Sequence, residues 1–241
     1  MDTEKTAQPF DPASFEHVPV LLNECLDGLK IDPAGTYLDG TAGGAGHSRQ
    51  IALRLNGEQG GRLISLDQDP DAVQTARARL AGLPATVVQI NFRYAGQALE
   101  QLGIETINGA LLDLGVSSHQ LDDAARGFSY RADAPLDMRM SQEGETAADL
   151  VNSESREELA RILRDYGEEP YAWQIAGKIV EARETSPIET TLRPAATSCV
   201  PFSIRPASCI RISLDRLNER ADLRCCLAGS LGQLANLISN Y

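Results

Sequence analysis

A largely apolar segment that passes directly into a long polar loop constrains the fold of this sequence most. The largely apolar segment covers 107–112 and is followed by Asp113. The polar loop then runs to Met140. Loops of this length are uncommon inside compact domains and usually carry a function. In open α/β sheets, ligands bind in the crevice beyond the carboxyl ends of the strands. We therefore expect this loop to face a ligand. A solvated connection is the alternative, but Phe128 and Leu136 are apolar enough to pack.

The first half of the chain alternates between strand and helix patterns. The predicted strands cover 36–39, 62–67, 86–90 and 107–113, and the predicted helices cover 20–30, 48–56, 70–81 and 94–102. Such alternation indicates right-handed crossovers and a parallel sheet. From residue 146 to about 184, apolar residues such as Leu159, Ile162 and Leu163 recur at helical spacing, with no strand pattern between them. The sequence therefore predicts a Rossmann-like α/β core followed by a helical subdomain.

A glycine-rich segment connects the first predicted strand to the next helix. Gly43, Gly44 and Gly46 allow the backbone to turn tightly and to approach a ligand closely. Asp67 ends the second predicted strand, where a carboxylate suits the two ribose hydroxyls of an adenosine cofactor. Both S-adenosylmethionine and a nicotinamide dinucleotide satisfy this arrangement, so the residues alone leave the cofactor open.

The net charge of −12 argues against unaided, non-specific binding of nucleic acid, because phosphate neutralisation needs clustered Lys and Arg. A local basic patch remains compatible with a structured RNA. Its candidate members are Arg49, Arg54, Arg62, Arg77, Arg79, Arg126, Arg131 and Arg139.

Location and metal binding are also limited by composition. No apolar run approaches the ~20 residues that span a bilayer, and the polar, acidic N-terminus does not resemble a signal peptide, so we expect a cytoplasmic protein. Cys25 lies in an apolar helix pattern and is expected in the core. The spacing of Cys199, Cys209, Cys225 and Cys226 gives no Cys-x-x-Cys pair, so no metal site is expected.

Four motifs give the sequence a resemblance to a known family. They are Glu16-His17-Val18-Pro19-Val20-Leu21-Leu22, Asp39-Gly40-Thr41-Ala42-Gly43-Gly44-Ala45-Gly46-His47, the block from Asp113 to Met140, and Tyr166-Gly167-Glu168-Glu169. Together they resemble the ribosomal RNA small subunit methyltransferase H family over residues 15–191, and no resemblance is visible beyond Leu192. The resemblance implies an S-adenosylmethionine-dependent methyltransferase that modifies the exocyclic N4 of a cytidine in 16S ribosomal RNA, within the small ribosomal subunit.

The resemblance also implies the residues of the cofactor site. It assigns S-adenosylmethionine contacts to Ala45, Gly46, His47, Asp67, Phe92, Asp113 and Gln120. Phe92 follows the third predicted strand, where an aromatic ring can pack on adenine or simply fill the core. Asp113 ends the fourth, where a buried carboxylate without a partner is costly unless it serves a ligand. His47 has no second histidine nearby in sequence and is not expected to bind a metal.

The group that holds the amine is not marked by a motif. The chain lacks the Asp-Pro-Pro-Tyr type of tetrapeptide by which many amino-methyltransferases hold it. Asp113 and Asp137 are therefore the candidate catalytic residues, with Ser117 and Ser118 as further candidates. The resemblance also implies that the helical subdomain interrupts the core and helps to bind RNA.

The expected organisation is a disordered leader at 1–14, a cofactor-binding domain at 15–145, the start of a helical insertion at 146–191 and an atypical tail at 192–241. Members of the family normally continue well past this length, so we expect a core that is incomplete at its C-terminus. Two alternatives stay open: a truncated or frameshifted, non-catalytic product of the same family, and a nicotinamide-dependent dehydrogenase. The dehydrogenase is disfavoured because no Tyr-x-x-x-Lys or His pairing for a proton relay stands at a suitable place.

Overall fold

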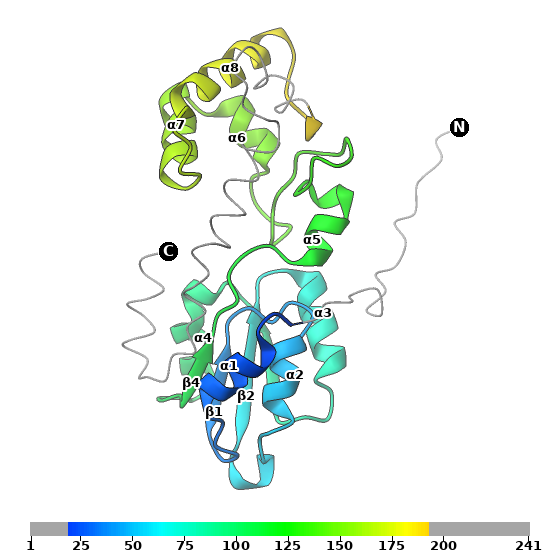
Figure 1. The fold of residues 1–241 in the computed structure, drawn as a ribbon, viewed down its shortest axis with the longest axis vertical. Coiled ribbons are helices and arrows are strands. Elements are labelled where there is room, and N and C mark those ends of the chain that lie inside the picture. Colours follow the sequence, from blue (N-terminus) through cyan, green and yellow to red (C-terminus); the bar gives the residue numbers. More distant parts are fainter. Residues whose placement is uncertain (1–18, 193–241) are drawn as a thin grey trace, which may run out of the picture. The chain divides into compact units, whose positions relative to one another are not determined.

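A computed structural model describes residues 19–192 of the chain (Figure 1). Within these residues the chain forms two compact units, the first ending at Asp113 and the second beginning at Leu114. The predicted leader, the predicted tail beyond Leu192 and the last four cysteines lie outside the described residues. No helix within 19–192 is long and apolar enough to cross a membrane.

The first unit is built on a parallel four-stranded sheet with the order β3-β2-β1-β4. The strands are β1 (Thr36–Asp39), β2 (Arg62–Asp67), β3 (Ala85–Gln89) and β4 (Gly109–Leu111). The sheet and its flanking helices confirm the predicted Rossmann-like core. β4 is shorter than the predicted strand at 107–113. At its carboxyl end, the Asp113 amide donates to the Thr41 hydroxyl instead of continuing the strand pairing.

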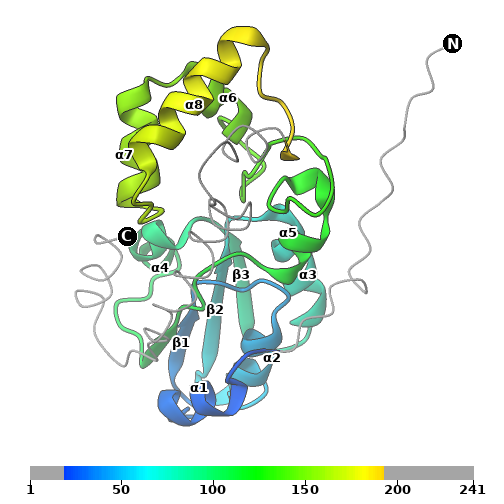
Figure 2. The same ribbon diagram turned by 45° about the horizontal axis from the view of Figure 1, so that its top comes forward.

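Helices cover both faces of the sheet (Figure 2). One face packs against α1 (Leu22–Leu29), α2 (Gly46–Ala52) and α3 (Pro70–Arg79), and the other against α4 (Ala95–Gln101). Alternation along the strands divides the side chains between two cores, so that Tyr37 and Leu63 join the first core whereas Leu38 and Ile64 join the second. Buried Cys25 lies in the first core, which confirms its predicted place.

The helix after the glycine loop, which is the segment 40–45 between β1 and α2, differs from its prediction. The sequence predicts a helix at 48–56 that begins near Ser48, but α2 begins at Gly46 and ends at Ala52. Ser48 is fully buried, and its hydroxyl donates to Asp39 instead of capping the helix. By contrast α3 begins as predicted, with Pro70 in its first turn and the Asp69 side chain accepting from the Asp71 amide. The short turns η2 (Gly57–Gln59) and η3 (Phe92–Tyr94) complete this unit.

The second unit contains the helices predicted beyond residue 146. They are α6 (Ala147–Ser153), α7 (Arg156–Asp165) and α8 (Ala172–Thr185), and α7 lies beside α8. Their shared core includes Leu159, Ile175 and Ile179, and also Leu136 from the long polar loop. That loop is less irregular than predicted, because it contains the short helix α5 (Ser118–Asp122) and the turn η4 (Ala124–Arg126). Phe128 and Leu136 are buried, as their apolar character predicts.

Candidate cofactor site

The glycine loop is bonded to the strands on both sides of β1. The Gly40 amide donates to the Leu111 carbonyl at 2.9 Å, and the Ala42 amide donates to the Leu66 carbonyl at 2.8 Å. Leu112 packs so closely against Gly40 that a β-carbon there would collide with its side chain, and the Phe92 Cβ would lie 3.3 Å away. Gly43 and Ala45 both adopt positive φ, at 48° and 59°. The loop therefore has a defined shape at the carboxyl edge of the sheet, where ligands bind in this class of fold.

Asp67, at the end of β2, holds this loop in place. Its Oδ2 accepts from the Gly43 amide at 2.8 Å, and its Oδ1 accepts from the Asp69 amide at 2.9 Å. Burial raises the pKa of Asp67 above its ordinary value, whereas the two backbone hydrogen bonds lower it. A β-carbon on Gly43 would meet no atom within 4 Å, so there is open space beside the amide that Asp67 holds. Each carboxylate oxygen keeps acceptor capacity for a hydroxyl donor.

Asp39 is a site residue whose role the sequence analysis missed. Its side chain is fully buried, with Oδ2 accepting from the Ser48 hydroxyl at 2.6 Å and Oδ1 from the Thr41 amide at 3.0 Å. The Ser48 hydroxyl also bonds to that of buried Ser65, at 2.6 Å. Burial raises the pKa of Asp39. The available signal was its position: like Asp67, it ends a strand just where a loop leaves the sheet.

Asp113 and His47 lie near each other at the same edge. The His47 Nδ1 is 4.0 Å from the Asp113 Oδ2, and its Nε2 is 3.2 Å from the Val20 carbonyl oxygen. His47 is buried in the first turn of α2. The Asp113 side chain is 32% exposed, so the expectation of a buried carboxylate there is wrong. β4 ends at Leu111, so Asp113 lies just beyond the carboxyl edge of the sheet.

The remaining predicted contacts of the first unit take different places. Ala45 is fully buried, while Gly46 begins α2 with Pro19 packed against it. Phe92 is half-buried and packs on the α4 side of the sheet. The first unit thus brings six predicted residues to the carboxyl ends of its strands or to the first turns that follow them: Ala45, Gly46, His47, Asp67, Phe92 and Asp113.

The other two predicted residues, Gln120 and Asp137, belong to the second unit. Gln120 is buried and forms a capping box with Ser117 at the start of α5. Asp137 accepts from the Arg139 side chain with both oxygens, and the closest contact is 2.6 Å. These bonds hold the pKa of Asp137 below its ordinary value. Both side chains therefore contribute to the structure of the long loop.

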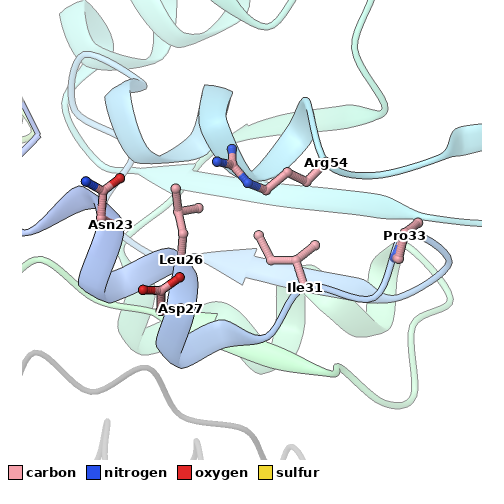
Figure 3. Close-up of a pocket in the computed structure, with 6 residues that line it drawn as sticks. All are labelled: Asn23, Leu26, Asp27, Ile31, Pro33 and Arg54. Carbon is pink, nitrogen blue, oxygen red and sulfur yellow. The ribbon is translucent and has the colours of Figure 1, made fainter.

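Two hollows lie on the first unit, one of them beside the glycine loop. The larger, of about 400 Å³, is lined by Asn23, Leu26, Asp27, Ile31, Pro33 and Arg54 (Figure 3). Pro33 precedes β1, so this hollow lies toward the amino ends of the strands, away from the glycine loop. The second, of about 330 Å³, includes Gly44, Ala45 and Arg79, and Arg79 donates to the Gly44 carbonyl at 2.6 Å. Within residues 19–192, no three His, Cys, Asp or Glu side chains are grouped to hold a metal ion.

Comparison with known proteins identifies the family. The family model described as the MraW methylase family matches residues 14–206, and so continues past residue 191, where the motif resemblance ended. Proteins named ribosomal RNA small subunit methyltransferase H are 50% identical over 216 residues in Lachnospira eligens and 54% identical over 186 residues in Paenibacillus sp.. These alignments cover 84% and 73% of this chain, and 68% and 58% of those relatives. The chain belongs to the MraW methylase family.

Proposed function

We propose that this chain binds S-adenosylmethionine and transfers a methyl group to the exocyclic N4 of a cytidine in 16S ribosomal RNA of the small subunit. The name of the relatives states small-subunit ribosomal RNA methylation, and membership of the family supports the same class of reaction. Membership also argues against the dehydrogenase alternative. The single observation that carries the cofactor proposal is the Asp67 carboxylate, held against the Gly43 amide beside open space. A ribosomal substrate would place this work in the cytoplasm.

The residues of the first unit fit an adenosine cofactor. Asp67 would accept hydrogen bonds from the two ribose hydroxyls, and the half-buried Phe92 ring offers a surface for the adenine. Ala45, Gly46 and His47 would line the loop where the backbone turns. Gln120 stays a proposed contact from the second unit. When bound, S-adenosylmethionine supplies a methyl group activated by attachment to a positively charged sulfur.

The geometry favours Asp113 over Asp137 as the residue that meets the amine. The Asp113 carboxylate is partly exposed at the carboxyl edge of the sheet, where it can accept a hydrogen bond from an exocyclic amine. Both oxygens of Asp137 accept from Arg139. Asp113 would orient the amine and could receive its proton, while Asp137 would hold the loop. Orientation and electrostatics are the main contributions such a site can make.

Because the chain is acidic overall, RNA phosphates would have to bind at a local cluster of basic residues. Of the arginines proposed for a basic patch, Arg126 is buried and donates to the Arg139 and Met140 carbonyls, and Arg139 is paired with Asp137. These two arginines therefore support the long loop. Half-buried Arg79 donates to the Gly44 carbonyl. The exposed arginines stay candidates for phosphate contacts: Arg49, Arg54, Arg62, Arg77 and Arg131.

Titration calorimetry on the full chain, followed by a transfer assay, tests the proposal. We expect S-adenosylmethionine to bind and NAD to release no binding heat. Labelled methyl groups should then enter small subunits that lack the modification, and nuclease digestion should recover them as N4-methylcytidine. Binding of NAD without binding of S-adenosylmethionine would support the dehydrogenase alternative. Binding of S-adenosylmethionine without transfer would favour the non-catalytic alternative.

A further inference from the structure

The hydroxyl of Thr41 joins the carboxyl ends of two neighbouring strands. Thr41 Oγ1 accepts from the Asp113 amide at 2.7 Å, which is a short hydrogen bond for a backbone donor. The same oxygen lies 3.4 Å from the Asp39 Oδ1, to which it donates. At 3.4 Å this hydroxyl contact is long, and the stronger tie to Asp39 is the Thr41 amide, which donates to the same Oδ1 at 3.0 Å. Thr41 thus connects the end of β1 to the residue that follows β4.

The Asp39 end of this connection has little freedom to move. Its carboxylate is fully buried and accepts from the Thr41 amide as well as from Ser48, a residue of α2. Ser48 is itself buried and bonded to Ser65 of β2. Thr41 is therefore held to a buried carboxylate through its own amide, and a shift of the Thr41 backbone would break a hydrogen bond to that carboxylate.

The Asp113 end needs such support. β4 ends at Leu111, so Asp113 lies beyond the strand pairing, and its amide bonds to the Thr41 side chain. The Asp113 carboxylate is partly exposed and lies 4.0 Å from the His47 ring. A small rotation of this backbone would move the carboxylate away from any ligand it meets, and misplacement of about 1 Å can strongly reduce a rate.

We propose that Thr41 is a positioning residue. It is held by the buried Asp39, which is itself bonded to Ser48, and its hydroxyl in turn holds the Asp113 amide. Thr41 would thereby fix the position of the carboxylate that orients the amine. This inference rests on the proposed function, because it gives the Asp113 carboxylate a task in methyl transfer. The Thr41 hydroxyl is already engaged with the Asp39 carboxylate and the Asp113 amide. Its effect on catalysis should therefore pass through Asp113 alone.

Three variants at Thr41 separate the hydroxyl from the shape of the side chain. Thr41→Val keeps the branched shape without the hydroxyl, Thr41→Ala removes both, and Thr41→Ser keeps the hydroxyl. Amide hydrogen exchange at Asp113, followed by NMR or by mass spectrometry of short peptides, should speed up in Thr41→Val and in Thr41→Ala but not in Thr41→Ser. Thr75→Val is the matched control, since that buried hydroxyl bonds within α3 to the Asp71 carbonyl.

Methyl transfer to small subunits then tests whether the connection matters for catalysis. We expect Thr41→Val to lower kcat about fivefold or more, as the loss of one buried hydrogen bond allows, and Thr41→Ser to restore it. In a double-mutant cycle with Asp113→Asn, the two effects should be clearly less than multiplicative, whereas Thr75→Val should combine with Asp113→Asn independently.

The outcomes separate this inference from the proposed function. Unchanged exchange at Asp113 in Thr41→Val, or fully multiplicative effects in the cycle, would overturn the positioning role even in an active enzyme. A wild-type chain that binds S-adenosylmethionine but never methylates subunits would overturn the proposed function instead. Exchange at Asp113 can be measured in either case, in the absence of cofactor and substrate.

Discussion

The Asp67 Oδ2 accepts the backbone amide of Gly43 at 2.8 Å, so one carboxylate joins the end of β2 to the glycine loop that follows β1. The same carboxylate is the proposed partner of the ribose hydroxyls. Loop geometry and cofactor recognition would therefore depend on a single side chain. Substitutions at Asp67 should disturb both, and two variants can separate them.

Asp67→Ala should weaken S-adenosylmethionine binding by ~1–3 kcal/mol, because it removes a charged acceptor from the ribose and leaves the Gly43 amide without its partner. Asp67→Asn keeps one oxygen for Gly43 and should lose less. Titration calorimetry measures both affinities, with Asp27→Ala as a control, since Asp27 is exposed on the hollow of Figure 3. Wild-type affinity in Asp67→Ala would remove Asp67 from the cofactor site.

Asp113→Asn and Asp137→Asn should have opposite effects on activity and stability. Asp113→Asn keeps the size of a partly exposed side chain, so kcat should fall while the thermal midpoint stays nearly unchanged. Asp137→Asn removes the ion pair with Arg139, so the midpoint should fall, with a stability loss of about 1 kcal/mol or less and little change in kcat.

Thermal unfolding and methyl transfer, measured on the same samples, distinguish the two roles. If activity of Asp113→Asn fell together with its midpoint and recovered fully at low temperature, Asp113 would be structural. A large loss of kcat in an Asp137→Asn variant of unchanged stability would make Asp137 the better candidate for the catalytic residue.

The pH dependence of stability should show two opposite signs. Burial raises the pKa of Asp39, so its contribution to stability is full below its ordinary value of 3.8 and is lost as pH rises through the raised pKa. The Arg139 side chain lowers the pKa of Asp137, so that contribution is present above 3.8 and is lost as pH falls through the lowered pKa.

Urea unfolding of wild type, Asp39→Asn and Asp137→Asn over a pH series checks these signs. Raising the pH from 3.8 should reduce the stability of wild type relative to Asp39→Asn, because only wild type must ionise a buried carboxyl group. Relative to Asp137→Asn, wild type should instead become less stable as the pH falls below 3.8. A difference between wild type and Asp39→Asn that stays constant with pH would show that burial does not control this carboxyl group.

Periodicity predicted the sheet well because strand patterns report burial directly. β1 and β2 have their predicted bounds, and β3 differs by one residue at each end. The sequence analysis failed where a residue took a hydrogen-bond partner on another element of the fold. Ser48 was expected to begin a helix, but it donates to Asp39 across the core. Asp113 was expected to be buried, but its backbone leaves the sheet to reach Thr41. Local patterns contain no information about such partners.

Alanine at either of two glycines of the loop should reduce stability, for different physical reasons. A β-carbon at Gly40 would collide with Leu112 and lie 3.3 Å from the Phe92 Cβ, so Gly40→Ala should lose ~1–3 kcal/mol of stability through overpacking. Gly43 has open space but a φ of 48°, so Gly43→Ala should lose only ~1–2 kcal/mol through backbone strain.

Cofactor affinity should separate these variants further. The new methyl group of Gly43→Ala would point into the open space proposed for S-adenosylmethionine, so its affinity should fall more than that of Gly40→Ala when both are measured under fully folded conditions. Urea unfolding and titration calorimetry give the two quantities for each variant. Equal cofactor affinity in wild type and Gly43→Ala would mean that the space beside Gly43 is not where the cofactor binds, and the assignment of Asp67 to the ribose would then lose its main geometric support.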